Sequence, residues 1–221
     1  MLRELNIGAN PAITNWRAFS AALASPQSRL EKLDLSRNTM CDLAVLSITN
    51  ALLINTTIKS LILNSTWDFS IAGTNHLYQM LESPACSLKI LNLNHNGLDD
   101  ELIQSLANAL ANNGLLRKLN LGNNWQITNV GWETFAAVLR NPNSSLEKLD
   151  LSPNEISDQT MMSFAGSLTN NIMLIDMILD HGPDEHSHHI KPVGCAAFIR
   201  MLCGDSSILS TYHSNHTLER L

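Results

Sequence analysis

One nine-residue pattern, Leu-x-x-Leu-x-Leu-x-x-Asn, recurs along almost the whole chain. Its copies begin at Leu2, Leu30, Ile58, Leu88, Leu116, Leu146 and Leu174, and a partial copy begins at Leu218. Successive copies start 28 or 30 residues apart, except that the last interval is 44 residues. A fixed period of this length is typical of solenoids, in which each unit stacks on its neighbours. The sequence therefore predicts a single repeat array over residues 1–221.

Each copy combines a strand pattern with a helix pattern. In the segment Leu-Glu-Lys-Leu-Asp-Leu that starts at Leu30, apolar and charged residues alternate with the period of a β-strand. After Asn96, the apolar residues of the segment 100–113 recur at the three- and four-residue spacing of an amphipathic helix. Asp99 precedes this segment as a helix N-cap, and Asn-Asn-Gly at 112–114 ends it. Each unit is therefore predicted to be a strand, a turn, a helix and a loop.

Stacking such units produces a curved α/β array. Parallel strands lie ~4.8 Å apart, whereas packed helices need ~8–10 Å. The side that carries the helices must therefore be longer than the side that carries the strands. The sequence predicts a parallel β-sheet on the concave side and helices on the convex side.

The pattern and its period resemble the leucine-rich repeat family, specifically the long ribonuclease-inhibitor-like type. The resemblance covers nearly the whole chain. An alternation of two kinds of repeat also resembles this type. Odd repeats end in a Pro-containing loop, and even repeats place Asp42, Asp100 or Asp158 at the start of the helix. The longer period of 56, 58 and 58 residues suggests duplication of repeat pairs.

The Asn that closes the pattern has a predicted structural role. It stands at Asn10, Asn38, Asn96, Asn124 and Asn154, whereas Thr66 and Gly182 replace it in two copies. A buried turn leaves backbone groups unpaired, and an Asn side chain both donates and accepts hydrogen bonds. The family resemblance implies that these residues form a ladder between the turns of adjacent repeats. The alternative is that Asn is frequent here because the loops are polar.

The concave face is the expected binding surface, because solenoids of this kind usually bind partners there. The candidate partner-binding residues alternate with the core positions of the strands and are Lys32, Asp34, Ile62, Ile90, Asn92, Lys118, Asn120, Lys148, Asp150 and Asp176. Lys118 and Lys148 share one position in adjacent repeats, with Glu147 and Asp150 near enough to offset their repulsion. The alternative is a solvated sheet that binds nothing.

No motif for catalysis, for a cofactor or for a standard metal site occurs in the sequence. There is no glycine-rich phosphate loop and no Gly-x-Ser-x-Gly nucleophile motif. His181, His186, His188 and His189 cluster beside two carboxylates, but their spacing matches no zinc motif. We interpret this cluster as a solvated insertion, with a metal site or a pH-responsive loop as alternatives. The cysteines Cys41, Cys86, Cys195 and Cys203 are expected to be packing residues.

Composition limits the location and the partners. The net charge of −6 argues against nucleic acid. Four scattered cysteines do not form a disulfide framework, no apolar stretch is long enough to span a membrane, and the N-terminus lacks a signal-peptide pattern. These features predict a cytoplasmic protein.

The two ends of the array are irregular. Insertions are predicted at 183–193 and 204–217, and the chain begins and ends inside strand patterns without a polar cap. The expectation is a fragment of a longer array. The alternative is self-association through the uncapped ends.

The predicted function is a non-enzymatic scaffold that binds a protein or peptide on its concave face. Two alternatives have the same kind of repeats. One is a regulator of the Ran GTPase-activating type, although no residue motif supports it, and fold alone does not determine function. The other is the sensing segment of an intracellular immune receptor.

Overall fold

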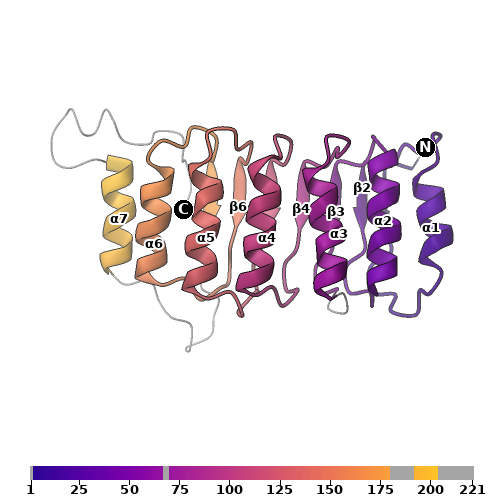
Figure 1. Ribbon diagram of the computed structural model, residues 1–221, viewed down its shortest axis with the longest axis horizontal. Helices are drawn as coiled ribbons and strands as arrows, with labels where there is room; N and C mark the ends of the chain where they lie inside the picture. The colour runs from indigo at the N-terminus through magenta and orange to yellow at the C-terminus, as the bar shows by residue number, and fades with distance from the viewer. Residues whose placement is uncertain (1, 67–69, 180–191, 204–221) are drawn as a thin grey trace.

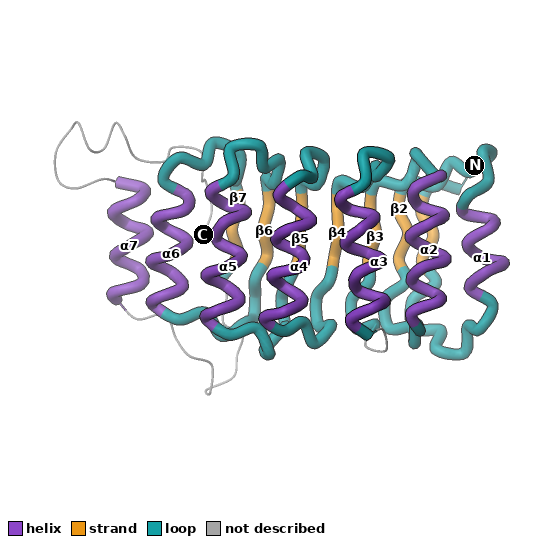
Figure 2. Tube along the Cα trace, viewed as in Figure 1, coloured by secondary structure: helices purple, strands orange, loops and turns teal. Residues whose placement is uncertain are grey.

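The computed structural model describes residues 2–66, 70–179 and 192–203, and strands and helices alternate through these ranges (Figures 1 and 2). The strands are β1 (Glu4–Asn6), β2 (Lys32–Asp34), β3 (Ser60–Ile62), β4 (Ile90–Asn92), β5 (Lys118–Asn120), β6 (Lys148–Asp150) and β7 (Asp176–Ile178). The helices are α1 (Trp16–Leu23), α2 (Asp42–Ile54), α3 (Ile71–Glu82), α4 (Asp100–Ala111), α5 (Asn129–Arg140), α6 (Asp158–Leu168) and α7 (Pro192–Cys203).

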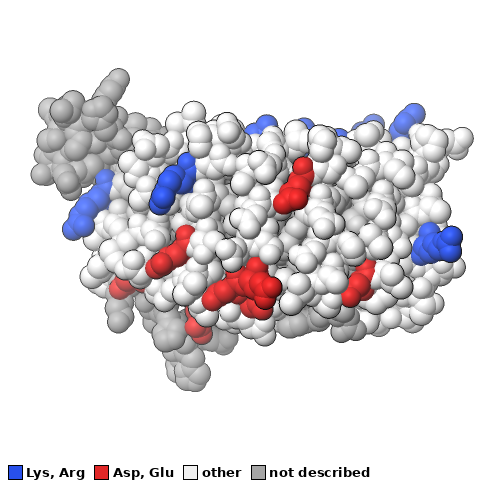
Figure 3. All heavy atoms as spheres, in the orientation of Figure 1, with Lys and Arg blue, Asp and Glu red and all other residues white. Residues whose placement is uncertain are grey.

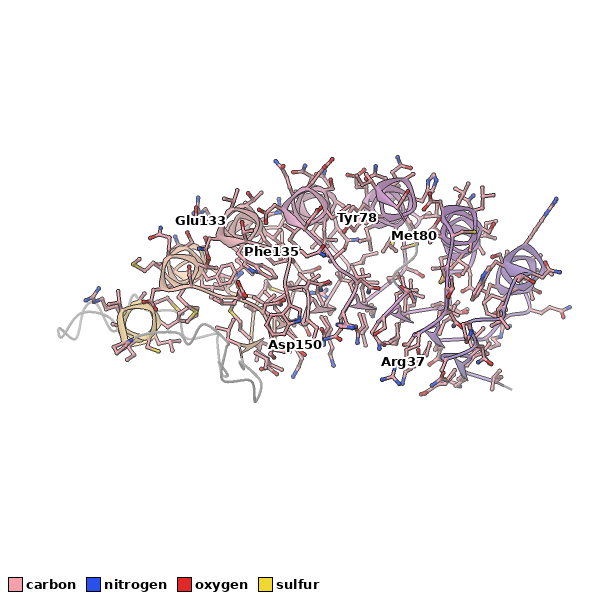
Figure 4. The ribbon with its side chains drawn as sticks, turned by 90° about the horizontal axis from the view of Figure 1, so that it is seen from below. Arg37, Tyr78, Met80, Glu133, Phe135 and Asp150 are labelled. Carbon is pink, nitrogen blue, oxygen red and sulfur yellow. The ribbon has the colours of Figure 1, made fainter. Side chains whose placement is uncertain are left out.

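The strands form one parallel sheet in the order β1 to β7. Their register is uniform, so the middle residue of each strand lies beside the middle residue of the next, as Leu91 lies beside Leu119. Figure 4 shows the helices along the outer side of an arc and the strands along its inner side. These observations confirm the predicted curved solenoid with a concave sheet and convex helices.

The core lies between the sheet and the helices and is mostly aliphatic. Leu33, Leu61 and Leu119 from the strands are buried in it. Its largest side chains come from α5 and α6, where the Trp132 ring lies edge-on to Phe135 and to Phe164, with centroids 6.2 and 6.4 Å apart. Phe135 points from its helix toward the sheet (Figure 4). Burial of large aromatic rings contributes strongly to stability, since Phe→Ala in a core typically costs about 3–5 kcal/mol.

Asparagines hold the turns that follow the strands. The Asn124 side chain accepts the N–H of Asn96 at 3.0 Å and donates to Leu121 O at 2.8 Å. Asn154 in turn accepts the N–H of Asn124 at 2.7 Å. The same pattern joins Asn38 to the N–H of Asn10 and Asn96 to the N–H of Thr66. The turns of adjacent repeats are therefore connected through these side chains.

Thr66, which replaces Asn in the third repeat, keeps part of this bonding. Its hydroxyl donates to Leu63 O at 2.7 Å, the position that corresponds to Leu121 O in the fifth repeat. Thr66 is fully buried, so the short side chain fits where the longer amide stands in other repeats. Gly182, the other departure, lies outside the described residues.

A second row of asparagines, which the sequence analysis did not identify, joins the ends of the helices. The Asn113 amide donates to Leu81 O at the end of α3, and its oxygen accepts the N–H of Leu116 at 2.8 Å. Asn55 and Asn171 make the equivalent bonds one repeat pair away on either side. Each of these residues therefore satisfies a carbonyl that its neighbour's helix end leaves free.

The aspartates that begin the even helices also connect repeats. Asp42 accepts the N–H and the hydroxyl of Ser70, both at 2.8 Å. Asp100 accepts the corresponding groups of Thr128 at 2.7 and 2.6 Å. Ser70 and Thr128 are the N-caps of α3 and α5. The carboxylate of one repeat therefore fixes the residue that caps the next helix.

The structure corrects two expectations about individual residues. Cys41 and Cys195 are exposed rather than buried, because each lies at or near the start of a helix, whereas Cys86 is buried as expected. Residues 192–193, assigned to an insertion from the sequence, begin α7. The clustered histidines, most of the first insertion and the whole of the second lie outside the described residues.

Candidate partner-binding face

Two rows of side chains cross the concave side of the sheet. One row comes from the first residue of each strand and the other from the third, because these positions point away from the buried middle residue. The uniform register places Lys118 beside Lys148 and Asn120 beside Asp150. All ten residues predicted to bind a partner belong to these two rows.

The two rows enclose a shallow hollow of about 200 Å³ over β3 to β7. Its lining combines eight of the ten predicted residues with Ile178 and the middle residues of β4, β5 and β6: Ile62, Ile90, Asn92, Lys118, Asn120, Lys148, Asp150, Asp176, Ile178, Leu91, Leu119 and Leu149. Lys32 and Asp34, on β2, lie outside it. The predicted surface therefore lies mostly inside the hollow and partly outside it.

The two lysines that share a register position differ in their ion pairs. Lys148 Nζ lies 3.0 Å from Asp176 Oδ2, and the Asp176 side chain is only 7% exposed. Lys118 is exposed and forms no ion pair with any residue in the described ranges. Lys118 therefore has free capacity for an anionic group.

Neither Glu147 nor Asp150, which were expected to offset the Lys118–Lys148 repulsion, forms an ion pair with either lysine in the described residues. Glu147 pairs instead with Arg117, at 3.5 Å. Asp150 accepts the Asn120 amide at 2.7 Å and the N–H of Ser152 at 3.0 Å. Asp176, which belongs to the next strand, neutralises Lys148 because the register places the two side chains beside each other.

The polar residues at the strand ends also support the turns. The side-chain oxygens of Asn92 and Asn120 accept the backbone N–H two residues further on, each at 2.9 Å. Such bonds are typical of Asx turns. These residues therefore shape the hollow through the backbone as well as lining it.

Charge is distributed unequally between the two sides of the molecule. The seven helices carry six carboxylates and three cations, Arg17, Arg140 and Arg200, the first and last of which lie on the end helices α1 and α7. Figure 3, which shows the helix side, displays acidic side chains mainly along its lower half, and Figure 4 shows Glu133 on the outer side of α5. On the sheet side, Lys59 and Lys89 immediately precede β3 and β4. Sequence analysis left them out because they stand before the alternating strand positions, although they recur there in consecutive repeats.

Cys86 is buried and is poorly placed for nucleophilic chemistry. Burial raises the pKa of the Cys86 thiol, so its reactive thiolate form is disfavoured. Within the described ranges, no three metal-ligating side chains gather into a site. The helices in those ranges are too short or too polar to cross a membrane.

Comparison with known proteins agrees with the repeat geometry. A family model described as "Leucine Rich repeat" matches residues 85–107, 112–136 and 143–165. The ribonuclease inhibitor of Mus musculus is 25% identical over 251 residues, which include 98% of this chain and 52% of that protein. The chain is a ribonuclease-inhibitor-like leucine-rich repeat protein.

This leucine-rich repeat protein is also similar to much longer proteins. NACHT, LRR and PYD domains-containing protein 14 of Mus musculus is 33% identical over 134 residues, which include 58% of the chain but 13% of that relative. The chain thus spans about half or less of the length of these relatives. Their names support a leucine-rich repeat scaffold and specify neither a partner nor a binding face.

Solved structures show the same fold at low sequence identity. The C-terminal domain of Caenorhabditis elegans tropomodulin has a TM-score of 0.55 and 19% identity, and the match covers 72% of this chain and 93% of that one. A structure titled Leiomodin-1 Actin-Binding Site 2 has a TM-score of 0.51 and 21% identity, with coverage of 62% and 79%. At these identities the likeness of the leucine-rich repeat protein to them concerns the fold alone.

Proposed function

We propose that this protein is a non-catalytic scaffold that binds a protein or peptide partner in the hollow on its concave face. The observation that carries the proposal is the gathering of eight predicted residues, from five consecutive strands, around one hollow. Leucine-rich repeats and the similarity to ribonuclease inhibitors support a protein-binding role at the level of the family.

The composition of the hollow suits a protein surface. Ile62 and Ile90 lie at one end and Ile178 at the other, while amides and charges lie between them. Protein interfaces likewise bring apolar contacts, hydrogen bonds and charged groups together on one surface. The lining has two lysines and two aspartates, so the hollow does not have the excess of positive charge that binds a phosphate backbone.

Photo-crosslinking from two positions of the fourth repeat tests the proposed face. One crosslinker replaces Ile90 on β4, and the other replaces Gln104, which is exposed on α4. Partner binding in the hollow should give specific adducts from position 90 and none from position 104. Adducts from position 104 alone would contradict the concave-face proposal.

A second candidate is that the array is the sensing segment of a larger intracellular receptor. The similarity to NACHT, LRR and PYD domains-containing proteins, of which the chain covers a small part, favours it. The sequence of the full gene tests this candidate, because it requires an adjoining nucleotide-binding domain.

Measuring GTP hydrolysis by small GTPases with and without the protein tests the Ran GTPase-activating alternative.

A further inference from the structure

Lys118 is the cation of the hollow that lacks a counter-ion among the described residues. It lies between Ile90 of β4 and Lys148 of β6, and only Lys148 is neutralised, by Asp176. We infer that the hollow accepts an extended acidic peptide segment whose carboxylate pairs with Lys118 and whose aliphatic side chains contact Ile62 and Ile90. This inference rests on the proposed function and specifies the chemistry of the partner.

Two more lysines extend the positive charge toward the start of the neighbouring strands. Lys89 N–H donates to Lys59 O at 2.8 Å, and Arg117 N–H donates to Lys89 O at the same distance, so these residues stand in line across the sheet. Arg117 pairs with Glu147, but neither Lys59 nor Lys89 forms an ion pair within the part of the chain that the structure describes. Lys59 Nζ donates to Thr56 O at 2.6 Å, so Lys89 and Lys118, from adjacent repeats, are the cations that are left without a counter-ion among the described residues.

The carboxylates near the hollow are already engaged. Asp176 is paired with Lys148, and both oxygens of Asp150 accept hydrogen bonds from neutral groups. Glu147 is paired with Arg117. A basic partner would have to compete for these groups, whereas Lys118 has no counter-ion among the described residues and is available to an acidic partner.

The opposite side of the protein strengthens this preference. The seven helices carry six carboxylates and three cations, and this net negative charge makes the convex side less favourable for an acidic segment. Complementary charge on one side and repulsion on the other guide the orientation of approach. An acidic segment is therefore directed to the strand side.

The size of the hollow limits the length of the segment. The hollow extends from β3 to β7, and four strand spacings of ~4.8 Å correspond to roughly 19 Å. An extended peptide advances ~3.3 Å per residue, so about six residues cross it. Lys118 lies on the middle strand of the five, which places the acidic residue near the centre and aliphatic residues toward the ends.

Binding of defined peptide pools tests this chemistry. Three pools of fluorescein-labelled octapeptides carry aliphatic residues at their outer positions and glutamate, glutamine or lysine at their centre. Fluorescence anisotropy should detect binding of the glutamate pool, weakened by salt at ~0.5 M because the attraction is electrostatic. Lys118→Gln should weaken binding about tenfold, the equivalent of one lost charge contact, and Lys118→Arg should retain it. A fluorescein-labelled RNA oligonucleotide serves as the competing class of ligand.

Arg17→Gln is the matched control. Arg17 is an exposed residue of α1, on the helix side, so the substitution removes one positive charge far from the hollow. It should leave peptide affinity within about twofold, and both Gln variants should keep the melting curve of the parent protein. Equal binding of the glutamine or lysine pool, tighter binding of the RNA, no binding of any pool, or an unaltered affinity in Lys118→Gln would each overturn the inference. If no pool binds while crosslinks still form from position 90, the inference fails and the proposed function stands. Crosslinks from position 104 alone would contradict the proposed function itself.

Discussion

The side-chain oxygen of Asn124 accepts the backbone N–H of Asn96 across the boundary between two repeats, at 3.0 Å. The amide of the same side chain donates back to Leu93 O and Leu121 O, at 3.1 and 2.8 Å. Asn124 is fully buried, so water does not replace these bonds when the side chain is lost. One residue therefore holds the inner turns of two repeats together.

Asn124→Ala should lower the free energy of unfolding by about 1–3 kcal/mol, because buried backbone groups lose their partner. Urea unfolding followed by circular dichroism measures the change. Asn108→Ala is the control, since Asn108 is exposed on α4, and its effect should stay within about 0.5 kcal/mol. Equal effects of the two substitutions would show that the asparagines in the turns after the strands do not stabilise the array.

The asparagines that join the ends of the helices can be tested by comparing two neighbouring residues. Asn113 is buried and bonds to Leu81 O at 2.7 Å, whereas the adjacent Asn112 is exposed. Asn113→Ala should cost about 1–3 kcal/mol and Asn112→Ala much less, as measured by thermal unfolding. A stable Asn113→Ala protein would argue against a role for this row.

Gly122 permits two turns to approach closely. A Cβ atom at this position would stand 1.9 Å from the backbone oxygen of Ser152 in the next repeat. Gly122→Ala should therefore lower the free energy of unfolding by about 3 kcal/mol, because the two turns must separate to make room for the methyl group. Gly114→Ala, where nothing lies within 4 Å, is the control and should change the melting temperature little. Similar melting temperatures for the two variants would contradict the close approach.

Tyr78 on α3 has a buried hydroxyl that forms no hydrogen bond with the described residues. Burial is the main cause that raises the pKa of this phenol above its ordinary range, so it stays neutral. Tyr78→Phe removes an unsatisfied polar group without a change of ring volume and should raise the stability by about 1 kcal/mol. Differential scanning calorimetry should show a higher melting temperature. A lower one would reveal that the hydroxyl bonds to water.

The Asp42 carboxylate should make stability depend on pH. The hydrogen bonds from the Ser70 hydroxyl and N–H hold the pKa of Asp42 below its ordinary value of 3.8. A lowered pKa in the folded state means that the stabilisation is complete above the unfolded pKa and is lost as the pH falls through the folded pKa. The stability difference between the parent protein and Asp42→Asn should therefore be constant from pH 7 to about pH 5 and shrink as the pH falls below about 4. A difference that does not vary with pH would exclude this linkage.

The periodic features of the fold follow from the sequence itself. The spacing of Leu88, Leu91 and Leu93 within one repeat, and the return of the same pattern at Leu116, determine the buried strand face and the curved stack. They do so because each repeat buries its apolar residues only against a neighbour built the same way. The ten candidate binding residues also follow from this alternation, since residues between buried strand positions must face the other side.

The tertiary structure decided which polar groups meet. Nothing in the pattern around Lys148 identifies Asp176 as its counter-ion, and nothing around Asn113 identifies Leu81 O as its acceptor. The sequence also left unresolved which part of the concave surface forms a hollow and which helix ends expose Cys41 and Cys195. The physical reason is the distance over which each interaction acts. Apolar periodicity acts through the average burial of a whole strand or helix, whereas hydrogen bonds and ion pairs require atoms of neighbouring repeats to lie within about 3–4 Å of each other. Only the stacked register of the repeats fixes such distances.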